Sequence, residues 1–253
     1  VSDADNLVAG DGNGASDVFV YDRASGQTTL ESRGSDGALA DDWSYYPAIS
    51  ADGRVVAFDS LATNLAANDG ERPDVFVRDR ASGQTRIASV SLTGGKADYP
   101  SFAPVLSADG RYVAFDSSAS NLVAFDANGN GSDVFVRDLA AGTTALVSVD
   151  AGASAQPDQS FDAAISPDGS FVAFAGLSVL SSGAADCQYY LRGPLRPPGQ
   201  PDVPLAAPST TVPPVETTSL TTEAPSTSTS LSTEPPPAAP TSTLVPTTAP
   251  TVG

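Results

Sequence analysis

One unit of just under sixty residues recurs along the chain, and it constrains the fold more than any other feature. The phrase SADGRVVAFDS at 50–60 returns as SADGRYVAFDS at 107–117 and, loosened, as SPDGSFVAFAG at 166–176. A second phrase, DVFVYD at 17–22, returns as DVFVRD at 74–79 and 133–138. Both phrases advance by 57 and then by 59 residues. Self-similarity at one fixed interval is typical of a repeat architecture.

Turn signals divide each repeat into four short strand-like runs, which are clearest in the copy at 101–150. The runs are SFAPVLS (101–107), RYVAFDS (111–117), DVFVRD (133–138) and TALVSVD (144–150). In the second run, side-chain alternation turns Val113 and Phe115 to one face and Tyr112 and Ala114 to the other. Because both faces carry apolar groups, we expect both to be covered, as in the stacked blades of a β-propeller.

The two phrases, S-A/P-D-G-x-x-V-A-F and D-V-F-V-x-D, resemble the WD-like repeat of TolB-type β-propellers over residues 1–192. The resemblance implies an all-β fold of four-stranded antiparallel blades. Sialidase Asp boxes also use Ser-x-Asp-x-Gly, but they place it in a different hairpin and lack the second phrase. The TolB-type interpretation is therefore preferred.

The repeats predict blades of unequal completeness. They are a half blade at 1–32, whole blades at 44–92 and 101–150, and a degenerate blade at 160–192 in which DCQYYLR replaces DVFVRD. Closed propellers have about four to eight blades, so this ring is incomplete. We favour further blades upstream of Val1, since the chain opens in mid-repeat without a methionine; the alternative is closure with another copy. Open sheet edges also invite self-association.

The composition changes after the repeats. Residues 193–253 are rich in Pro, Thr and Ser, and from residue 198 onward they include no Lys, Arg or aromatic residue. Such a segment cannot bury enough apolar surface to offset the entropy of ordering. We predict a disordered stalk that is partly polyproline II.

The net charge of −18 excludes some classes of partner. Four acidic residues lie in the stalk, so −14 belongs to residues 1–197. An acidic body repels nucleic acid and anionic membrane surfaces, and no run approaches the roughly 18 apolar residues of a membrane span. We therefore expect no nucleic-acid partner and no membrane insertion. The charge suits divalent cations or basic partners, although it can also serve solubility alone.

The chain has no histidine and one cysteine, Cys187. These counts exclude a Ser-His-Asp triad, a Cys-His pair, a His-ligated zinc site and an intrachain disulfide. A glycosidase needs two carboxyl groups in unlike environments, whereas the acids here are repeated equivalents, and G-x-S-x-G is absent. We expect no enzyme activity unless the chain is a fragment of a hydrolase. We expect Cys187 to be a small buried strand residue.

Two sets of aspartates recur with the repeat. Asp52, Asp109 and Asp168 occupy the S-x-D-G turns, and the acids that end the third strands are Asp22, Asp79 and Asp138. Every blade needs the same turn, whereas one active site needs only one copy. Recurrence therefore predicts that these carboxylates cap backbone amides.

The loop between the second and third strands of each repeat is rich in carboxylates and amides. It reads DANGNGSD at 126–133, DGNGASD at 11–17 and DGERPD at 69–74. Oxygen ligands at alternate positions, with Gly allowing a sharp turn, are what calcium requires of a loop. The candidate ligands are Asp126, Asn128, Asn130 and Asp133 in the third repeat, and Asp11, Asn13 and Asp17 in the first.

Calcium is thus the one cofactor that the sequence suggests. The second loop is the weakest candidate because Arg72 and Pro73 interrupt it. The alternative is that Asn-Gly and Asp-Gly are simply turn formers that accept positive φ.

Aromatic residues gather near the starts of the first strands: Trp43, Tyr45, Tyr46 and Tyr99. They either pack between blades, which we favour, or line a ligand-binding face. The function that we predict is a non-catalytic binding or scaffold propeller of an exported bacterial protein. Its location would be extracellular, periplasmic or on the cell surface, and its ligand another protein or a cell-surface glycan.

Two other functions remain open at the level of sequence. The chain could be the propeller domain of a peptidase or glycosidase whose catalytic part is missing. It could also be a structural spacer on the cell surface.

Overall fold

The structure is a computed structural model, and it describes residues 1–67, 72–149, 159–179 and 185–193. These residues belong to the first of two units in the chain, residues 1–208. Their regular elements are all β-strands: β1 (Phe19–Asp22), β2 (Gln27–Leu30), β3 (Ser44–Ile49), β4 (Val55–Ser60), β5 (Asp74–Asp79), β6 (Gln84–Ile87), β7 (Ser101–Leu106), β8 (Tyr112–Ser117), β9 (Asp133–Asp138), β10 (Thr143–Leu146), β11 (Gln159–Ile165), β12 (Val172–Val179) and β13 (Ala185–Arg192).

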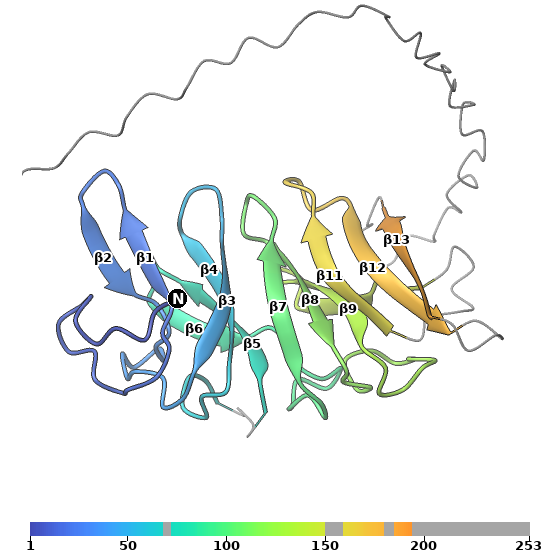
Figure 1. The fold of residues 1–253 in the computed structure, drawn as a ribbon, viewed down its shortest axis with the longest axis horizontal. Helices are drawn as coiled ribbons and strands as arrows, with labels where there is room; N and C mark the ends of the chain where they lie inside the picture. The colour runs from blue at the N-terminus through green and yellow to red at the C-terminus, as the bar shows by residue number, and fades with distance from the viewer. Residues whose placement is uncertain (68–71, 150–158, 180–184, 194–253) are drawn as a thin grey trace, which may run out of the picture. The chain divides into compact units, whose positions relative to one another are not determined.

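The strands form four antiparallel sheets in chain order (Figure 1). We name them blade 1 (β1 and β2), blade 2 (β3–β6), blade 3 (β7–β10) and blade 4 (β11–β13). Every strand in a blade pairs with its neighbours in sequence, so each sheet is a simple meander. The described part is therefore an incomplete β-propeller, and the predicted all-β fold class is confirmed. The predicted stalk lies, apart from Gly193, outside the described residues.

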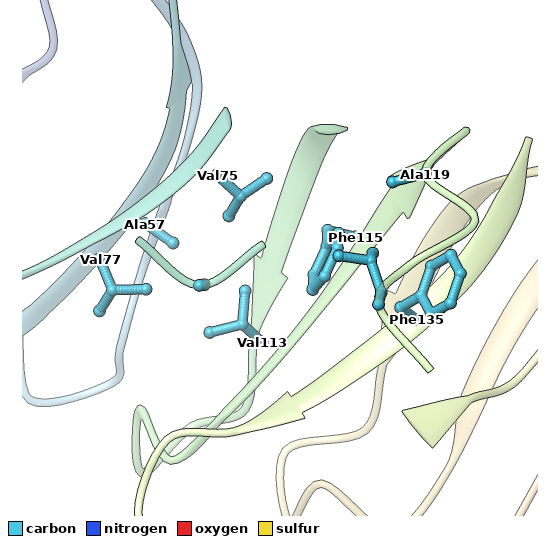
Figure 2. Close-up of a cluster of buried hydrophobic side chains, with 9 residues drawn as sticks. Ala57, Val75, Val77, Val113, Phe115, Ala119 and Phe135 are labelled. Atoms are coloured by element: carbon cyan, nitrogen blue, oxygen red, sulfur yellow. The ribbon is translucent and has the colours of Figure 1, made fainter. Parts of the chain in front are cut away.

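Packing between blades buries both faces of the central strands. Ala57, Val75 and Val77 of blade 2 meet Val113, Phe115 and Phe135 of blade 3 in one apolar cluster (Figure 2). On the opposite face of blade 2, Phe58 stacks on Phe76 at 5.8 Å in a cluster shared with Val18 of blade 1. Ala114 and Tyr112 face blade 4. The predicted alternation along residues 111–117 is thus confirmed.

The S-x-D-G turns link the blades as well as the strands. In blade 3 the Ser107 hydroxyl donates to Asp109 Oδ1 at 2.6 Å, and the Arg111 N–H donates to the same oxygen at 3.0 Å. The same bonds recur around Asp52 and Asp168, so the predicted capping role is confirmed.

Successive S-x-D-G turns also contact one another directly. The Ala51 N–H donates to the Ala108 carbonyl at 2.8 Å, and the Ala108 N–H donates to the Pro167 carbonyl at 2.8 Å. Gly110 has φ +68°, and a Cβ there would lie 2.8 Å from Val55 Cγ2 of the preceding blade. Both its positive φ and this close approach require glycine.

The first strand of each blade from 2 to 4 contains a bulge. The register shifts between Tyr45 and Ala48, and the same shift follows Phe102 and Phe161. The residue inside each bulge has a positive φ of 47–57°: Tyr46, Ala103 and Asp162. A non-glycine residue is held in this conformation only where its surroundings fix it.

Blade 4 departs from the pattern of blades 2 and 3. The first and second strands of blades 2 and 3 are joined by a serine pair, Ser44 with Ser60 at 2.9 Å and Ser101 with Ser117 at 2.8 Å. In blade 4 the partner position of Ser160 is Gly176. The buried Ser160 hydroxyl accordingly has no hydrogen-bond partner among the described residues.

Blade 1 contains only the third and fourth strands of a blade. Ser2 forms an isolated bridge with Asp17, which corresponds to the Ser60–Asp74 and Ser117–Asp133 pairs that end the second strands of blades 2 and 3. Within the described residues, β1 otherwise pairs only with β2. The described residues thus leave the outer edge of β1 unpaired along Phe19–Asp22.

Candidate functional site

The aspartate that begins each third strand is held by a serine of the fourth-strand end. The Ser32 hydroxyl donates to Asp17 Oδ1 at 2.5 Å, Ser89 to Asp74 Oδ1 at 2.7 Å and Ser148 to Asp133 Oδ1 at 2.7 Å. Asp17 and Asp133 were predicted as calcium ligands, and both are fully buried. One oxygen of each is therefore engaged in the blade itself, a role that explains why this aspartate recurs.

The loop ahead of β9 turns around Asp126. The N–H groups of Asn128 and Gly129 both donate to Asp126 Oδ1, each at 3.2 Å, and Gly129 has φ +70°. Asn130, the third candidate ligand of this loop, is exposed. The loop thus uses Asp126 as an Asx-type turn residue.

The corresponding loop of blade 1 is arranged differently. Asn13 Nδ2 donates to the Ala40 carbonyl at 2.9 Å, and the Ala15 N–H donates to Asn13 Oδ1 at 3.1 Å. Burial raises the pKa of Asp11, and the negative charges of Asp17 and Asp5 raise it further. Asn13 is thus committed to backbone groups, whereas Asp11 lies in a negative field that favours a cation.

The carboxylates among the candidate calcium ligands do not lie together in one cluster. In the described residues, no three Asp, Glu, His or Cys side chains converge closely enough to hold a metal ion. The second loop lies partly outside the described residues, but its Arg72 guanidinium lies 5.1 Å from the ring centroid of Tyr99. Any calcium at the first or third loop would need amide and backbone oxygens besides carboxylates.

The aspartates that end the third strands are also structural. Asp79 accepts from Arg54 Nε at 3.2 Å and Nη2 at 2.7 Å, and its Oδ1 also accepts the Ala81 N–H at 2.9 Å. Asp138 is held by Arg111 in the same way. The Arg54 hydrogen bonds lower the pKa of Asp79 to about 2. The predicted capping role of these residues is confirmed.

A second set of buried carboxylates, outside the predicted sets, joins one blade to the next. Asp59 Oδ2 accepts the Ala103 N–H at 2.9 Å, and Asp116 Oδ2 accepts the Asp162 N–H at 3.0 Å. Each donor is the positive-φ residue of the next blade's bulge. Burial raises the pKa of Asp59 and of Asp116 to about 6. Both residues are the Asp of the AFDS phrase, which two copies of the repeat share, and this recurrence is the sequence signal that could have identified them.

The interface of blades 1 and 2 holds a buried charge network around Glu31. Arg80 Nε donates to Glu31 Oε1 at 2.8 Å, and Arg78 Nε donates to Oε2 at 3.2 Å. The side chains of Glu31 and Arg78 are only 5% and 11% exposed. Glu31 does not recur at the repeat interval, so the repeat gave no signal for it.

Aromatic side chains lie at equivalent positions of three neighbouring first strands. Tyr45 of β3, Phe102 of β7 and Phe161 of β11 each begin a bulge. Trp43 lies 6.4 Å from Tyr45, ring centroid to ring centroid, in an edge-on arrangement. We call Trp43, Tyr45, Phe102 and Phe161 the aromatic row.

The preferred interpretation of the aromatic residues, packing between blades, is wrong for three of them. Trp43 is 51% exposed, Tyr46 is 64% exposed and Tyr99 is 38% exposed. Cys187 is exposed too, which corrects the expectation of a buried thiol. The physical reason is local: the bulge turns Tyr46 away from the sheet, and Cys187 lies on β13, the last strand of blade 4.

A cleft of about 520 Å³ lies along the outer edge of β6. Its lining includes Ser35, Thr85 and Arg86. The Ser35 hydroxyl accepts the Thr85 N–H at 2.9 Å and donates to the Thr85 carbonyl at 3.1 Å, so it satisfies the strand edge at that residue.

The raised pKa of Asp59 predicts a pH-dependent stability. The folded state holds the Asp59 proton up to about pH 6, whereas the unfolded chain releases it near pH 3.8. The protonated carboxyl group therefore adds to the free energy of unfolding in full below pH 3.8, and this addition is lost as the pH rises through 6. Its full size is roughly 3 kcal/mol. In urea denaturation from pH 4 to 7, Asp59→Asn should gain stability relative to the unsubstituted protein as the pH rises. Parallel pH profiles for the two proteins would contradict this assignment.

The Glu31 network predicts an asymmetry between buried and exposed ion pairs. Glu31→Gln leaves two guanidinium groups without their carboxylate, so we expect the free energy of unfolding to fall by about 3 kcal/mol. Arg54→Gln breaks an ion pair whose arginine side chain is 56% exposed, and we expect a loss below about 1 kcal/mol. Urea denaturation of both variants measures the difference, and equal losses would contradict the buried network.

Comparison with known proteins adds no family. No protein-family model and no curated protein matches the chain. Among solved structures, the chain is similar to TolB from Acinetobacter baumannii, with 13% identity and a TM-score of 0.44, over 70% of this chain and 35% of that one. A protein assigned as TolB from Agrobacterium tumefaciens is 16% identical, with a TM-score of 0.44, over 71% of this chain and 53% of that one. The tricorn protease is 11% identical, with a TM-score of 0.41, over 73% of this chain and 16% of that one.

The chain therefore spans about a third, a half and a sixth of the lengths of these three proteins. The fold assignment rests on the sheets described above: successive antiparallel meanders that pack face to face, which is the architecture of a β-propeller.

Proposed function

We propose that this chain is a non-catalytic binding propeller of an exported protein, and that the aromatic row is its contact surface. The observation that supports the proposal is the exposure of Trp43, directly before β3, and of Phe102, on the first strand of the next blade. Large aromatic groups that stay exposed in line, on a rigid scaffold, suit stacking against sugar rings or contact with a protein loop. Among the described residues, no helix is long and apolar enough to cross a membrane.

The repeated polar residues support this proposal indirectly. Asp52, Asp79 and Asp74, with their counterparts in other blades, accept hydrogen bonds from neighbouring backbone, serine or arginine groups. These roles are the same in each blade and serve the fold. Of the aromatic row, Trp43 differs between blades, since Pro100 stands at its place in the next repeat, and it is the member that we assign to recognition.

The open edge of β1 supports self-association as a second mode of contact. Within the described part of the chain, the edge is unpaired over Phe19–Asp22, and it lies beside an apolar cavity of about 270 Å³ lined by Phe19, Pro47 and Val56, among others. A strand from a second copy, or any extended segment with alternating apolar residues, could add to the sheet there.

The aromatic row can be tested with the protein's own fluorescence, because Trp43 is its single tryptophan. A bacterial envelope glycan, offered as soluble peptidoglycan fragments, should change the Trp43 emission if it stacks on the row. Phe102→Ala should weaken that binding about tenfold, since loss of one stacking contact costs roughly 1–1.5 kcal/mol. Phe125→Ala is the matched control, because Phe125 is 73% exposed and lies outside the row.

Peptidoglycan fragments that leave the emission unchanged would exclude this glycan. Equal weakening by Phe102→Ala and Phe125→Ala would exclude the row as the contact surface. A protein ligand would then be sought by the same emission change, with extracellular proteins as titrants.

We also propose that calcium rigidifies the loops at Asp126 and Asp11. The negative field at Asp11 supports this proposal, as does the alternate spacing of carboxylate and amide residues in both loops. The expected result is a melting temperature that rises by a few degrees on adding calcium and falls again with chelator. Asp126→Asn and Asp11→Asn should each reduce the shift, whereas Asp168→Asn, in an exposed S-x-D-G turn, should leave it unchanged. An unchanged midpoint in the unsubstituted protein would leave these loops as ordinary turns.

A further inference from the structure

The interface of blades 2 and 3 repeats the scaffold of the interface of blades 1 and 2, but it carries a different set of charges. At the repeat interval, Arg137 corresponds to Arg78, and Ala88 stands where Glu31 stands. Arg86 takes the place of Thr29, and Leu139 takes the place of Arg80. One interface therefore has a carboxylate between guanidinium groups, whereas the other has guanidinium groups and no matching carboxylate.

Strand pairing shows that Arg86 and Arg137 face each other across this interface. Arg86 pairs with Val77, whose side chain packs against blade 3. Arg137 pairs with Val113, whose side chain packs against blade 2. Directly opposite residues of an antiparallel pair share a face of the sheet. The two arginines thus point into the same interface from opposite sides.

Arg137 has few partners for a guanidinium in this position. Among the described residues it donates one hydrogen bond, from Nη1 to Thr144 Oγ1 at 3.0 Å. Arg78, its counterpart, donates to Glu31, to Thr85 and to backbone carbonyls. Burial lowers the pKa of Arg137, and the nearby positive charge of Arg86 lowers it further.

The acid next to Arg137 in sequence does not replace Glu31. Asp138 points to the opposite face of the strand, where Arg111 Nη2 and Nε hold it at 2.7 and 3.1 Å. It also accepts the N–H groups of Ala140 and Ala141. Its charge reaches Arg137 only through space.

We propose that Arg86 and Arg137 form a binding site for the carboxylate group of a ligand, at the mouth of the interface between blades 2 and 3. The interface of blades 1 and 2 shows the chemistry that this scaffold accepts: a carboxylate 2.8 and 3.2 Å from two guanidinium Nε atoms. Among the described residues of blades 2 and 3 no carboxylate takes this place, and we assign it to the ligand. Arg86 is exposed and also lines the cleft of about 520 Å³ along β6, so a ligand has access to it.

This site is separate from the aromatic row and does not depend on it. A guanidinium pair recognises a carboxylate through charge-assisted hydrogen bonds, which are stronger than neutral ones. The carboxylate can belong to a small acid or to an acidic side chain of a partner protein, and the experiment separates these two sources.

The test is thermal melting with glutarate, or with a blocked peptide that carries one glutamate, against sodium chloride added to equal conductivity. Glutarate at 10 mM should raise the melting temperature by about 2–4 °C. Arg137→Gln should abolish this shift. Arg86→Glu should abolish it too, because it supplies a carboxylate opposite Arg137 from within the chain. Arg23→Glu is the control, since Arg23 is exposed in the β1–β2 turn and undergoes the same change of charge.

A shift with glutarate alone assigns the site to small acids, and a shift with both probes assigns it to acidic side chains as well. The proposal is overturned if glutarate acts no better than chloride, or if Arg86→Glu and Arg23→Glu keep the same shift. Equal stabilisation by sulfate would overturn the assignment to a carboxylate. Because Arg86 is exposed, Arg86→Glu remains informative even if Arg137→Gln fails to fold.

Discussion

The burial of both faces of each blade is the constraint on which the rest of this structure depends. A sheet of four short strands has too little apolar surface to be stable alone, so Phe58 and Val77, on opposite faces of blade 2, each need a neighbouring blade. The polar contacts follow from this packing. Once the blades lie together, Asp59 reaches the backbone of the next bulge and the S-x-D-G turns meet through Ala51 and Ala108.

The sequence predicted the features that recur in every repeat. The alternation of Val113 and Ala114, and the capping roles of Asp109 and Asp138, follow from local periodicity and turn chemistry, and the structure confirms them. It did not predict the bulges, because a positive φ at Tyr46, Ala103 and Asp162 is fixed by the carboxylate of a neighbouring blade or by strand packing rather than by residue type. The exposure of Trp43 and Cys187 was missed for a related reason: it depends on which strands lie beside them.

Residues that recur and residues that do not recur have different roles in this molecule. The Asp74–Ser89 hydrogen bond and its counterparts in blades 1 and 3 stabilise each blade in the same way. Glu31 occurs once, and so does the pair of arginines at the next interface. In a repeat protein, the deviation from the consensus is therefore more informative about recognition than the consensus itself. At Ser160, whose partner position is Gly176, a deviation instead removes a hydrogen bond that blades 2 and 3 have.

The contrast between the two interfaces also bears on how the molecule responds to ionic strength. Glu31 is buried, so counter-ions screen its attraction to Arg78 and Arg80 only slightly. Arg86 is exposed, and its repulsion of Arg137 is screened far more readily. Added salt would therefore weaken the repulsion between the two arginines of blades 2 and 3 while changing the Glu31 network of blades 1 and 2 little, so the two interfaces differ in their response to ionic strength.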